Sequence, residues 1–113
     1  MEIKTADYYV RYDENLATIF FGGFLRLEGV DAYKEILDLC VNVFDKQKQI
    51  SMNLTDLQFL NSSGISMFSM FVLKIRDLGD AKLTIQGSEK ILWQTKSLKN
   101  LKRLMPSMTL EFI

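Results

Sequence analysis

The sequence predicts an α/β fold with one mixed central sheet. Two strand-like segments come first, joined by a short polar turn, which is typical of a β-hairpin. After them, apolar residues recur alternately at helical and strand spacing, as in folds with largely parallel central strands. The 113 residues fit a single domain, residues 1–113, with one core.

The hairpin is expected over residues 7–12 and 16–24, where aromatic and β-branched side chains are frequent. Residues 13–15, Asp-Glu-Asn, supply the turn. Gly22-Gly23 lies inside the second strand, and we interpret this pair as a bend or bulge, because no phosphate-loop pattern surrounds it.

A helix is predicted over residues 31–46, with Asp31 as its cap. Its apolar residues recur every three or four positions, which is typical of a helix with one buried face. Cys40 lies on this face, so we expect an inert core thiol. A short third strand follows at residues 50–54.

The pattern of residues 51–79 predicts a strand, a polar turn and a helix. Asn61-Ser62-Ser63-Gly64 forms the turn, and residues 65–78 form the helix. Small hydroxyl side chains at a helix start can cap free backbone N–H groups, and the same position favours an added anion. Ser62 and Ser63 are therefore candidates both for capping and for modification.

This helix has two apolar sides. We assign one face to the core, formed by Ile65, Phe68, Val72 and Ile75. The opposite side carries Met67, Met70, Phe71 and Lys74. Either these residues form an exposed partner-binding surface, or the helix is buried more deeply, for example by a homodimer.

The C-terminal third continues the alternation. We expect a strand at 81–86, a helix that begins with Ser88 as cap and runs to about Thr95 or Leu98, and a last strand at 108–113. Residues 97–104 either continue this helix or form a second helical turn. Pro106 ends the helix. A cluster of basic residues in this region is interpreted as a solvated face, formed by Lys90, Lys96, Lys99, Lys102 and Arg103.

Composition restricts the partners. Fourteen basic and fourteen acidic residues give zero net charge, so no nucleic-acid partner is expected. Apolar runs are too short to cross a membrane, and the N-terminus lacks a signal-peptide pattern. With a single cysteine, this indicates a cytoplasmic protein without membrane attachment.

The residue types also argue against catalysis. The chain has no histidine and one cysteine, which removes histidine-based acid–base chemistry and makes a transition-metal site implausible. No dinucleotide or phosphate-loop motif is present, so no cofactor is expected. Asp56, near a strand end, is a candidate catalytic carboxylate by its position, but we interpret it as a structural residue at the edge of the sheet, near the serine turn.

The run Asn53 to Ile65, N-L-T-D-L-Q-F-L-N-S-S-G-I, resembles the STAS domain of bacterial anti-sigma factor antagonists. That family has a strand ending in Asp, then an apolar pair, Asp-Ser-Ser-Gly and an apolar helix. The order of elements is also similar along nearly the whole chain. Two departures are Asn61, where the family has Asp, and the absence of the family's C-terminal helix after the last predicted strand.

The resemblance implies a phosphoprotein of signal transduction and transcription regulation. In the family, the unphosphorylated domain binds an anti-sigma factor, a GHKL-type serine kinase, and a PP2C-type phosphatase reverses the phosphorylation. Carried over, the modified serine matches Ser62, with Ser63 as the alternative, and Asn61 and Gly64 join the contact region. Because Asn61 lacks the Asp charge, phosphorylation is expected to be slower or replaced by constitutive binding. The alternative function is a non-switching scaffold or oligomerisation module of a larger signalling assembly.

Overall fold

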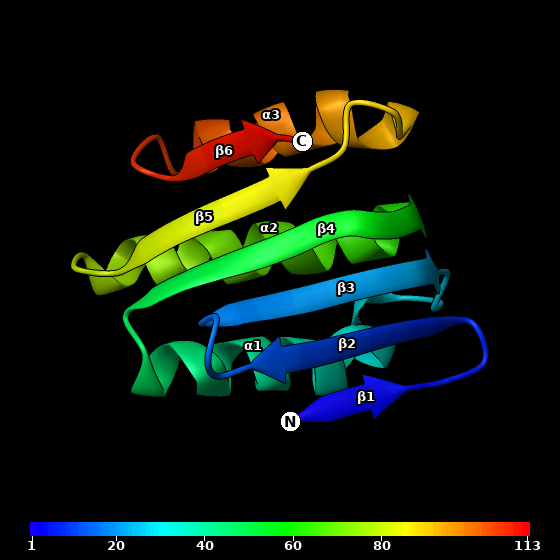
Figure 1. The fold of residues 1–113 in the computed structure, drawn as a ribbon, viewed down its shortest axis with the longest axis horizontal. Coiled ribbons are helices and arrows are strands. Elements are labelled where there is room, and N and C mark those ends of the chain that lie inside the picture. The colour runs from blue at the N-terminus through cyan, green and yellow to red at the C-terminus, as the bar shows by residue number, and fades with distance from the viewer.

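The computed structural model describes all residues from Met1 to Ile113. It contains six strands and three α-helices, one of them preceded by a short 3-10 helix (Figure 1). In chain order they are β1 (Glu2–Lys4), β2 (Tyr8–Asp13), β3 (Thr18–Leu25), η1 (Val30–Tyr33), α1 (Lys34–Lys46), β4 (Gln49–Leu60), α2 (Ser62–Leu78), β5 (Lys82–Gly87), α3 (Leu92–Leu104) and β6 (Thr109–Phe112). The predicted α/β architecture is confirmed, with β1 as an additional strand.

The six strands form one mixed sheet in sequential order, β1-β2-β3-β4-β5-β6. The first three strands pair antiparallel, and β3 to β6 pair parallel. Each parallel connection therefore leads to the neighbouring strand in the same direction along the sheet. Right-handed connections of this kind place every helix on the same face.

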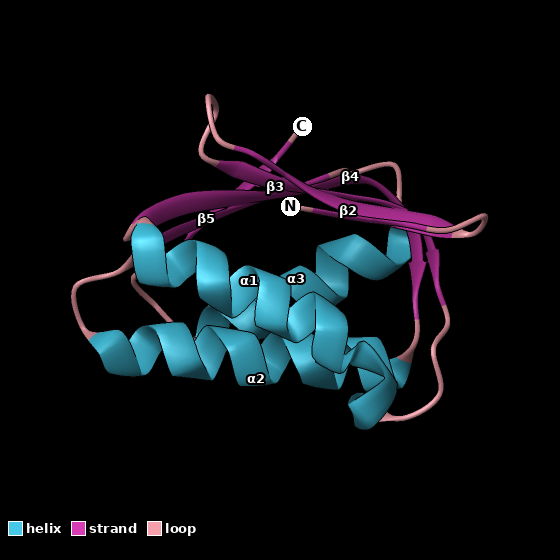
Figure 2. Cartoon of the chain, turned by 90° about the horizontal axis from the view of Figure 1, so that it is seen from below, coloured by secondary structure: helices cyan, strands magenta, loops and turns pink.

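Figure 2 shows this two-layer arrangement, with α1, α2 and α3 covering one face of the sheet and the other face free of helices. The core lies between the layers and contains 27 buried apolar residues. On the open face, polar and aromatic side chains interact across strands. The Arg11 guanidinium lies 4.4 Å from the centre of the Phe20 ring, and Asn53 donates a hydrogen bond to Gln86.

The Gly22-Gly23 pair has the backbone role that the sequence predicts. Gly23 adopts φ +87°, and the pairing of β3 with β4 shifts register on either side of this pair. A Cβ at Gly22 would collide with the ring of Tyr9, and one at Gly23 would collide with the carbonyl oxygen of Asp7. Close packing and a positive φ both require glycine here.

Two predicted helix caps are wrong. Asp31 lies inside the short 3-10 helix, and α1 starts at Lys34 without a side-chain cap. Helix α3 starts at Leu92 after Ile91, again without a side-chain cap. The Ser88 hydroxyl instead accepts a bond from the backbone N–H of Lys90, which closes the turn before the helix.

The third predicted strand is too short at residues 50–54, because β4 continues to Leu60. Only its first part pairs with β5, from Gln49 to Asn53. Beyond that point the carbonyl groups on this side of β4 need other partners. Helix α3 supplies them: the Gln94 amide donates to the carbonyls of Leu54, at 2.6 Å, and Leu57, at 2.9 Å.

Helix α2 lies between its two neighbours and packs against both α1 and α3. The Phe71 ring meets Phe44 of α1 edge-to-face, with ring centres 5.4 Å apart. The Phe68 ring meets Phe21 of the sheet in the same way, at 5.2 Å. A wide part of the circumference of α2 is therefore buried.

No helix has the length and the apolar character that a membrane crossing requires.

Candidate functional site

The predicted polar turn lies at the carboxyl end of β4, where the chain passes into α2. Asn61 is the N-cap residue, with extended backbone angles, and its side-chain oxygen accepts a bond of 3.0 Å from the N–H of Gly64. An amide oxygen in this position satisfies one of the free N–H groups of a helix start. The serines follow directly, so α2 begins at Ser62 rather than at Ile65.

Asn61 also connects the helix start to the segment between β3 and η1. Its side-chain oxygen accepts a second bond, 2.7 Å long, from the buried hydroxyl of Tyr33. Its side-chain nitrogen donates to the carbonyl of Leu27 at 2.8 Å. The Leu27 N–H in turn donates to the Tyr33 hydroxyl at 3.3 Å. The Asn61 amide thus uses its oxygen twice and its nitrogen once.

This network explains why Asn suits the position. A carboxylate would keep the two accepted bonds but could not donate to the Leu27 carbonyl. Burial raises the pKa of the Tyr33 phenol above its ordinary value, so the hydroxyl keeps its proton and remains a donor to Asn61.

The two serines differ in their surroundings. The Ser63 hydroxyl is half-buried and accepts a bond of 3.2 Å from the N–H of Gly29. Ser62 is exposed, and its hydroxyl makes no hydrogen bond within the chain. The first turn of α2 carries no acidic residue. Ser62 is therefore the serine whose hydroxyl is free, at a helix end that favours an anion.

Gly64 permits close packing under this turn. A Cβ on it would collide with the side chain of Leu60 and would lie 3.0 Å from the Tyr33 hydroxyl. Its role is thus to let the helix approach the end of β4 and Tyr33. Gly64 is buried, so it gives no exposed surface to a partner.

The outer face of α2 differs from the predicted partner surface. Met67 and Phe71 are fully buried, so their prediction as partner-binding residues is wrong and the alternative of deeper burial is confirmed for these two. Met70, at 47% exposure, and Lys74 are exposed as expected. Exposed residues follow one another every four positions along the helix, and we call these the α2 stripe: Ser62, Ser66, Met70 and Lys74. Ser66 is absent from the predicted site, although its spacing from Ser62 places it one turn away on the same face.

Asp56 lies on the open face of the sheet and accepts a bond of 3.2 Å from the Tyr9 hydroxyl. This bond holds the Tyr9 ring over Gly22. Burial, and then the charge of Asp56, raise the pKa of the Tyr9 phenol. The hydrogen-bond partners of Asp56 are thus Tyr9 and Gln58, and it makes no hydrogen bond to the serine turn.

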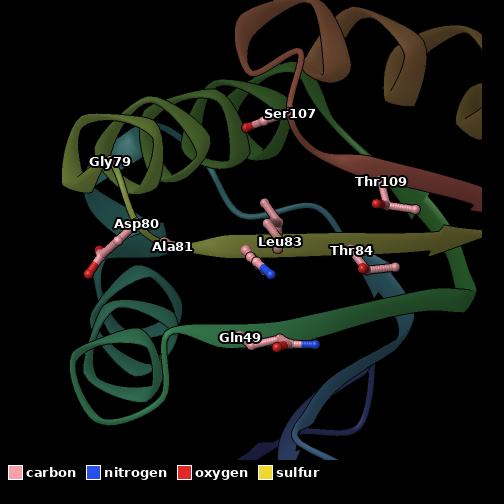
Figure 3. Close-up of a pocket in the computed structure, with 9 residues that line it drawn as sticks. Gln49, Gly79, Asp80, Ala81, Leu83, Thr84, Ser107 and Thr109 are labelled. Atoms are coloured by element: carbon pink, nitrogen blue, oxygen red, sulfur yellow. The ribbon is translucent and has the colours of Figure 1, made fainter.

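The largest hollow lies away from this turn, at the amino ends of the parallel strands (Figure 3). It measures about 460 Å³ and contains none of the predicted site residues. Its lining is mainly polar and comes from the starts of β4, β5 and β6 and the turns before β5 and β6: Gln49, Gly79, Asp80, Ala81, Lys82, Leu83, Thr84, Ser107 and Thr109. No group of three or more His, Cys, Asp or Glu side chains is arranged to hold a metal ion.

Solved structures share the fold over nearly the whole chain. The apo form of SiaC from Pseudomonas aeruginosa matches with TM-score 0.75 and 12% identity, covering 99% of this chain and 96% of that one. A chain in the crystal structure of the Pseudomonas aeruginosa diguanylate cyclase SiaD in complex with its activator SiaC matches with TM-score 0.72 and 11% identity, covering 100% and 99%. A further SiaC structure gives 0.60 and 13%, covering 99% and 93%. No protein-family model and no curated protein match the sequence. These likenesses confirm the STAS-like fold.

Proposed function

We propose that this chain is a non-catalytic, protein-binding signalling module whose partner contacts the start of α2 and the α2 stripe. The fold supports this role, because it is the fold of SiaC, which is described as the activator of a diguanylate cyclase and occurs in a complex with it. The surface supports it as well. The half-exposed Met70 lies between the polar positions Ser66 and Lys74, and methionine is favoured at adaptable interfaces.

We propose further that phosphorylation of Ser62 switches this binding off. The observation that carries the proposal is the difference between the two serines: Ser62 is exposed and unbonded, whereas Ser63 holds Gly29. A phosphate adds about −1.5 to −2 charges at pH 7. At the start of α2 this charge is tolerated by the fold, because it meets the positive end of the helix dipole. Inside a partner interface it would cost desolvation and repel acidic groups.

The STAS resemblance supplies the enzyme classes for this switch. In the proposal, the partner is a GHKL-type serine kinase that acts as an anti-sigma factor, and a PP2C-type phosphatase removes the phosphate. Asn61 does not block this chemistry, since its side chain is directed at the Tyr33 hydroxyl and the Leu27 carbonyl rather than at solvent.

The test combines site mapping with partner capture from the native cells. The tagged protein is recovered as wild type and as the variants S62D, S62A and S63A. We expect a phosphatase-sensitive phosphate on Ser62. We also expect S62D to weaken partner binding about a hundredfold, the equivalent of ~3 kcal/mol, while S62A binds like unmodified wild type. The matched control is S107D, which adds the same charge in the exposed turn before β6, near the C-terminal end of α2 and so at the opposite end of that helix from Ser62.

The outcomes separate the two functions. A phosphate on Ser63 instead would keep the switch and move its site. If neither serine is modified under any growth condition and S62D captures the same partners as wild type, the switch is wrong. Partner capture that depends on Met70 and Lys74 but ignores Ser62 would indicate the non-switching scaffold.

A further inference from the structure

The charges of this neutral chain are separated along the sheet. Residues 1–60 carry ten acidic and six basic side chains, which gives −4, and residues 61–113 carry four acidic and eight basic, which gives +4. Because the strands lie in sequential order, these halves occupy opposite ends of the molecule (Figure 1). The fold therefore has an acidic end at β1 and α1 and a basic end at β6 and α3.

The basic end has a defined patch on α3. This helix carries four lysine and arginine residues and no carboxylate. Lys96, Lys99 and Arg103, which we call the basic patch, line a hollow of about 330 Å³ together with Thr95 and Asn100. None of the three takes part in an ion pair, since the only two pairs in the chain are Lys34–Asp38 and Arg76–Asp77. Their charge is available to a partner.

The acidic end has a matching hollow between β1 and α1. It measures about 300 Å³ and is lined by Met1, Glu2, Ile3, Glu35, Asp38, Leu39 and Asn42. We call Glu2, Glu35 and Asp38 the acidic patch. No lysine or arginine lines this hollow, although Lys34 pairs with Asp38 on the exposed side of α1. Three carboxylates thus stand at one end of the molecule and three cations at the other.

The backbone is compatible with contact between these two ends. Strand β1 is antiparallel to β2, and β2 to β3, so β1 runs in the same direction as β6. Both are edge strands with one free side. Helices α1 and α3 lie on the same face of the sheet (Figure 2). A second copy displaced along the sheet would therefore place its α1 beside α3 of the first copy, and its β1 beside β6.

From these observations we propose that the protein associates head to tail with a second copy of itself, the basic patch of one copy docking on the acidic patch of the next. Such a contact is heterologous, so it builds rings or open chains rather than a closed two-fold dimer. It leaves the α2 stripe and Ser62 uncovered, because α2 lies between α1 and α3. The association is thus separate from the proposed switch and does not depend on it.

The strength of this contact follows from its exposure. Exposed ion pairs are weak individually, and salt screens them. We expect weak association that is favoured at low ionic strength, where the screening length is about 30 Å, and that falls at least about tenfold towards ~0.15 M salt, where it is about 8 Å.

The test is a charge exchange followed by sedimentation velocity across protein and salt concentration. The variant K96E/K99E makes the α3 patch acidic, and E35K/D38K makes the α1 patch basic. We expect each variant alone to be monomeric, because like patches then face each other. Mixed together, they should associate as strongly as wild type, because every junction again joins opposite charges. The control K48E/K82E has the same net charge as K96E/K99E but alters exposed lysines outside both patches, and it should associate like wild type.

Each outcome decides the proposal. Wild type that stays monomeric at low salt and high concentration overturns it. Association of K96E/K99E alone or of E35K/D38K alone also overturns it. The same holds for a mixture of the two that remains monomeric although circular dichroism shows that both variants are folded. If K96E/K99E loses binding to nucleic acid while wild type stays monomeric, the basic patch serves a different partner and the self-association is wrong. The proposed switch has its own readout, partner capture by S62D, so either can fail alone.

Discussion

Asn61 is the residue on which the geometry of the serine turn depends. One side chain caps α2, orients Tyr33 and holds Leu27, and all three bonds lie between 2.7 and 3.0 Å. The sequence indicates a cap at this position. It does not indicate the bond to Leu27, because that contact joins residues 34 positions apart and needs the folded β3–η1 segment. The bond that the Asn61 side chain donates to the Leu27 carbonyl therefore explains why Asn suits this position.

Substitutions of Asn61 should distinguish the contributions of these hydrogen bonds to stability. N61A removes the cap and both other bonds, and we expect it to lower the free energy of unfolding by about 2–3 kcal/mol. N61D keeps the two accepted bonds and gains from the helix dipole, so we expect a loss of only about 1 kcal/mol. Urea denaturation at neutral pH measures both. Equal stability of N61A and wild type would contradict the assigned network, and S62A is the control, since its hydroxyl has no partner.

At the scale of elements, the α2 helix shows which buried residues the apolar periodicity predicts correctly and which it does not. The pattern correctly places Phe68, Val72 and Ile75 in the core. It wrongly exposes Met67 and Phe71, because it treats the helix as lying on a sheet with solvent on the far side. The structure places α2 between two other helices, so the buried arc extends towards α1, where Phe71 meets Phe44. Neighbouring helices are long-range features, and spacing along one helix does not reveal them.

The part of β4 after Asn53, which does not pair with β5, is a second feature that the sequence does not indicate. Gln94 is completely buried, donates to the carbonyls of Leu54 and Leu57, and accepts from the N–H of Ser88 at 2.7 Å. Trp93 supports it from the rim, where its indole N–H donates to the carbonyls of Leu57 and Gln58. From the sequence alone, Gln94 is expected to be an exposed polar residue, because the unpaired carbonyls of β4 that it binds are known only from the fold.

Gln94 should therefore be among the most sensitive positions outside the apolar core. Q94L has a similar size but leaves the Leu54 carbonyl and the Ser88 N–H without partners, while the Leu57 carbonyl keeps only the Trp93 indole as donor. We expect it to lower the free energy of unfolding by about 3 kcal/mol or more. The matched variant W93F removes one bifurcated donor at a partly exposed site and should cost about 1 kcal/mol. Thermal and urea unfolding of both variants give the comparison. A Q94L protein as stable as W93F would show that water replaces the amide.

At the scale of the whole molecule, zero net charge conceals a strongly polar charge distribution. The net charge of each half of the chain can be counted from the sequence. Its position in space depends on the sequential strand order, which keeps the N-terminal half at one end and the C-terminal half at the other. In an open α/β sheet with interleaved strands, the same charges would be mixed. This is why the sequence predicts only a solvated face for the basic residues of the C-terminal region, whereas the fold places those of α3 at one end of a charge dipole.

Buried and half-buried titratable groups contribute to the response of the whole fold to alkaline pH. Burial raises the pKa of the Cys40 thiol from 9.0 to about 12, and burial also raises the pKa values of Tyr8, Tyr9 and Tyr33 above 10.0. In each case the folded state favours the neutral form. The stability that these groups contribute is complete below their ordinary pKa values and is lost as pH rises towards the folded-state values.

We therefore expect the free energy of unfolding to fall steadily above about pH 9, with Cys40 contributing a slope of about 1.4 kcal/mol per pH unit. Urea unfolding of wild type and C40A at a series of pH values tests this. C40A should be less stable at neutral pH because a cavity remains, yet its stability should fall less steeply between pH 9 and the onset of tyrosine ionisation. A parallel check is thiol labelling near pH 8, where Cys40 should react only as fast as the protein opens. Identical pH slopes in the two proteins, or immediate labelling of the native state, would mean that the Cys40 thiol is accessible to solvent in the folded protein.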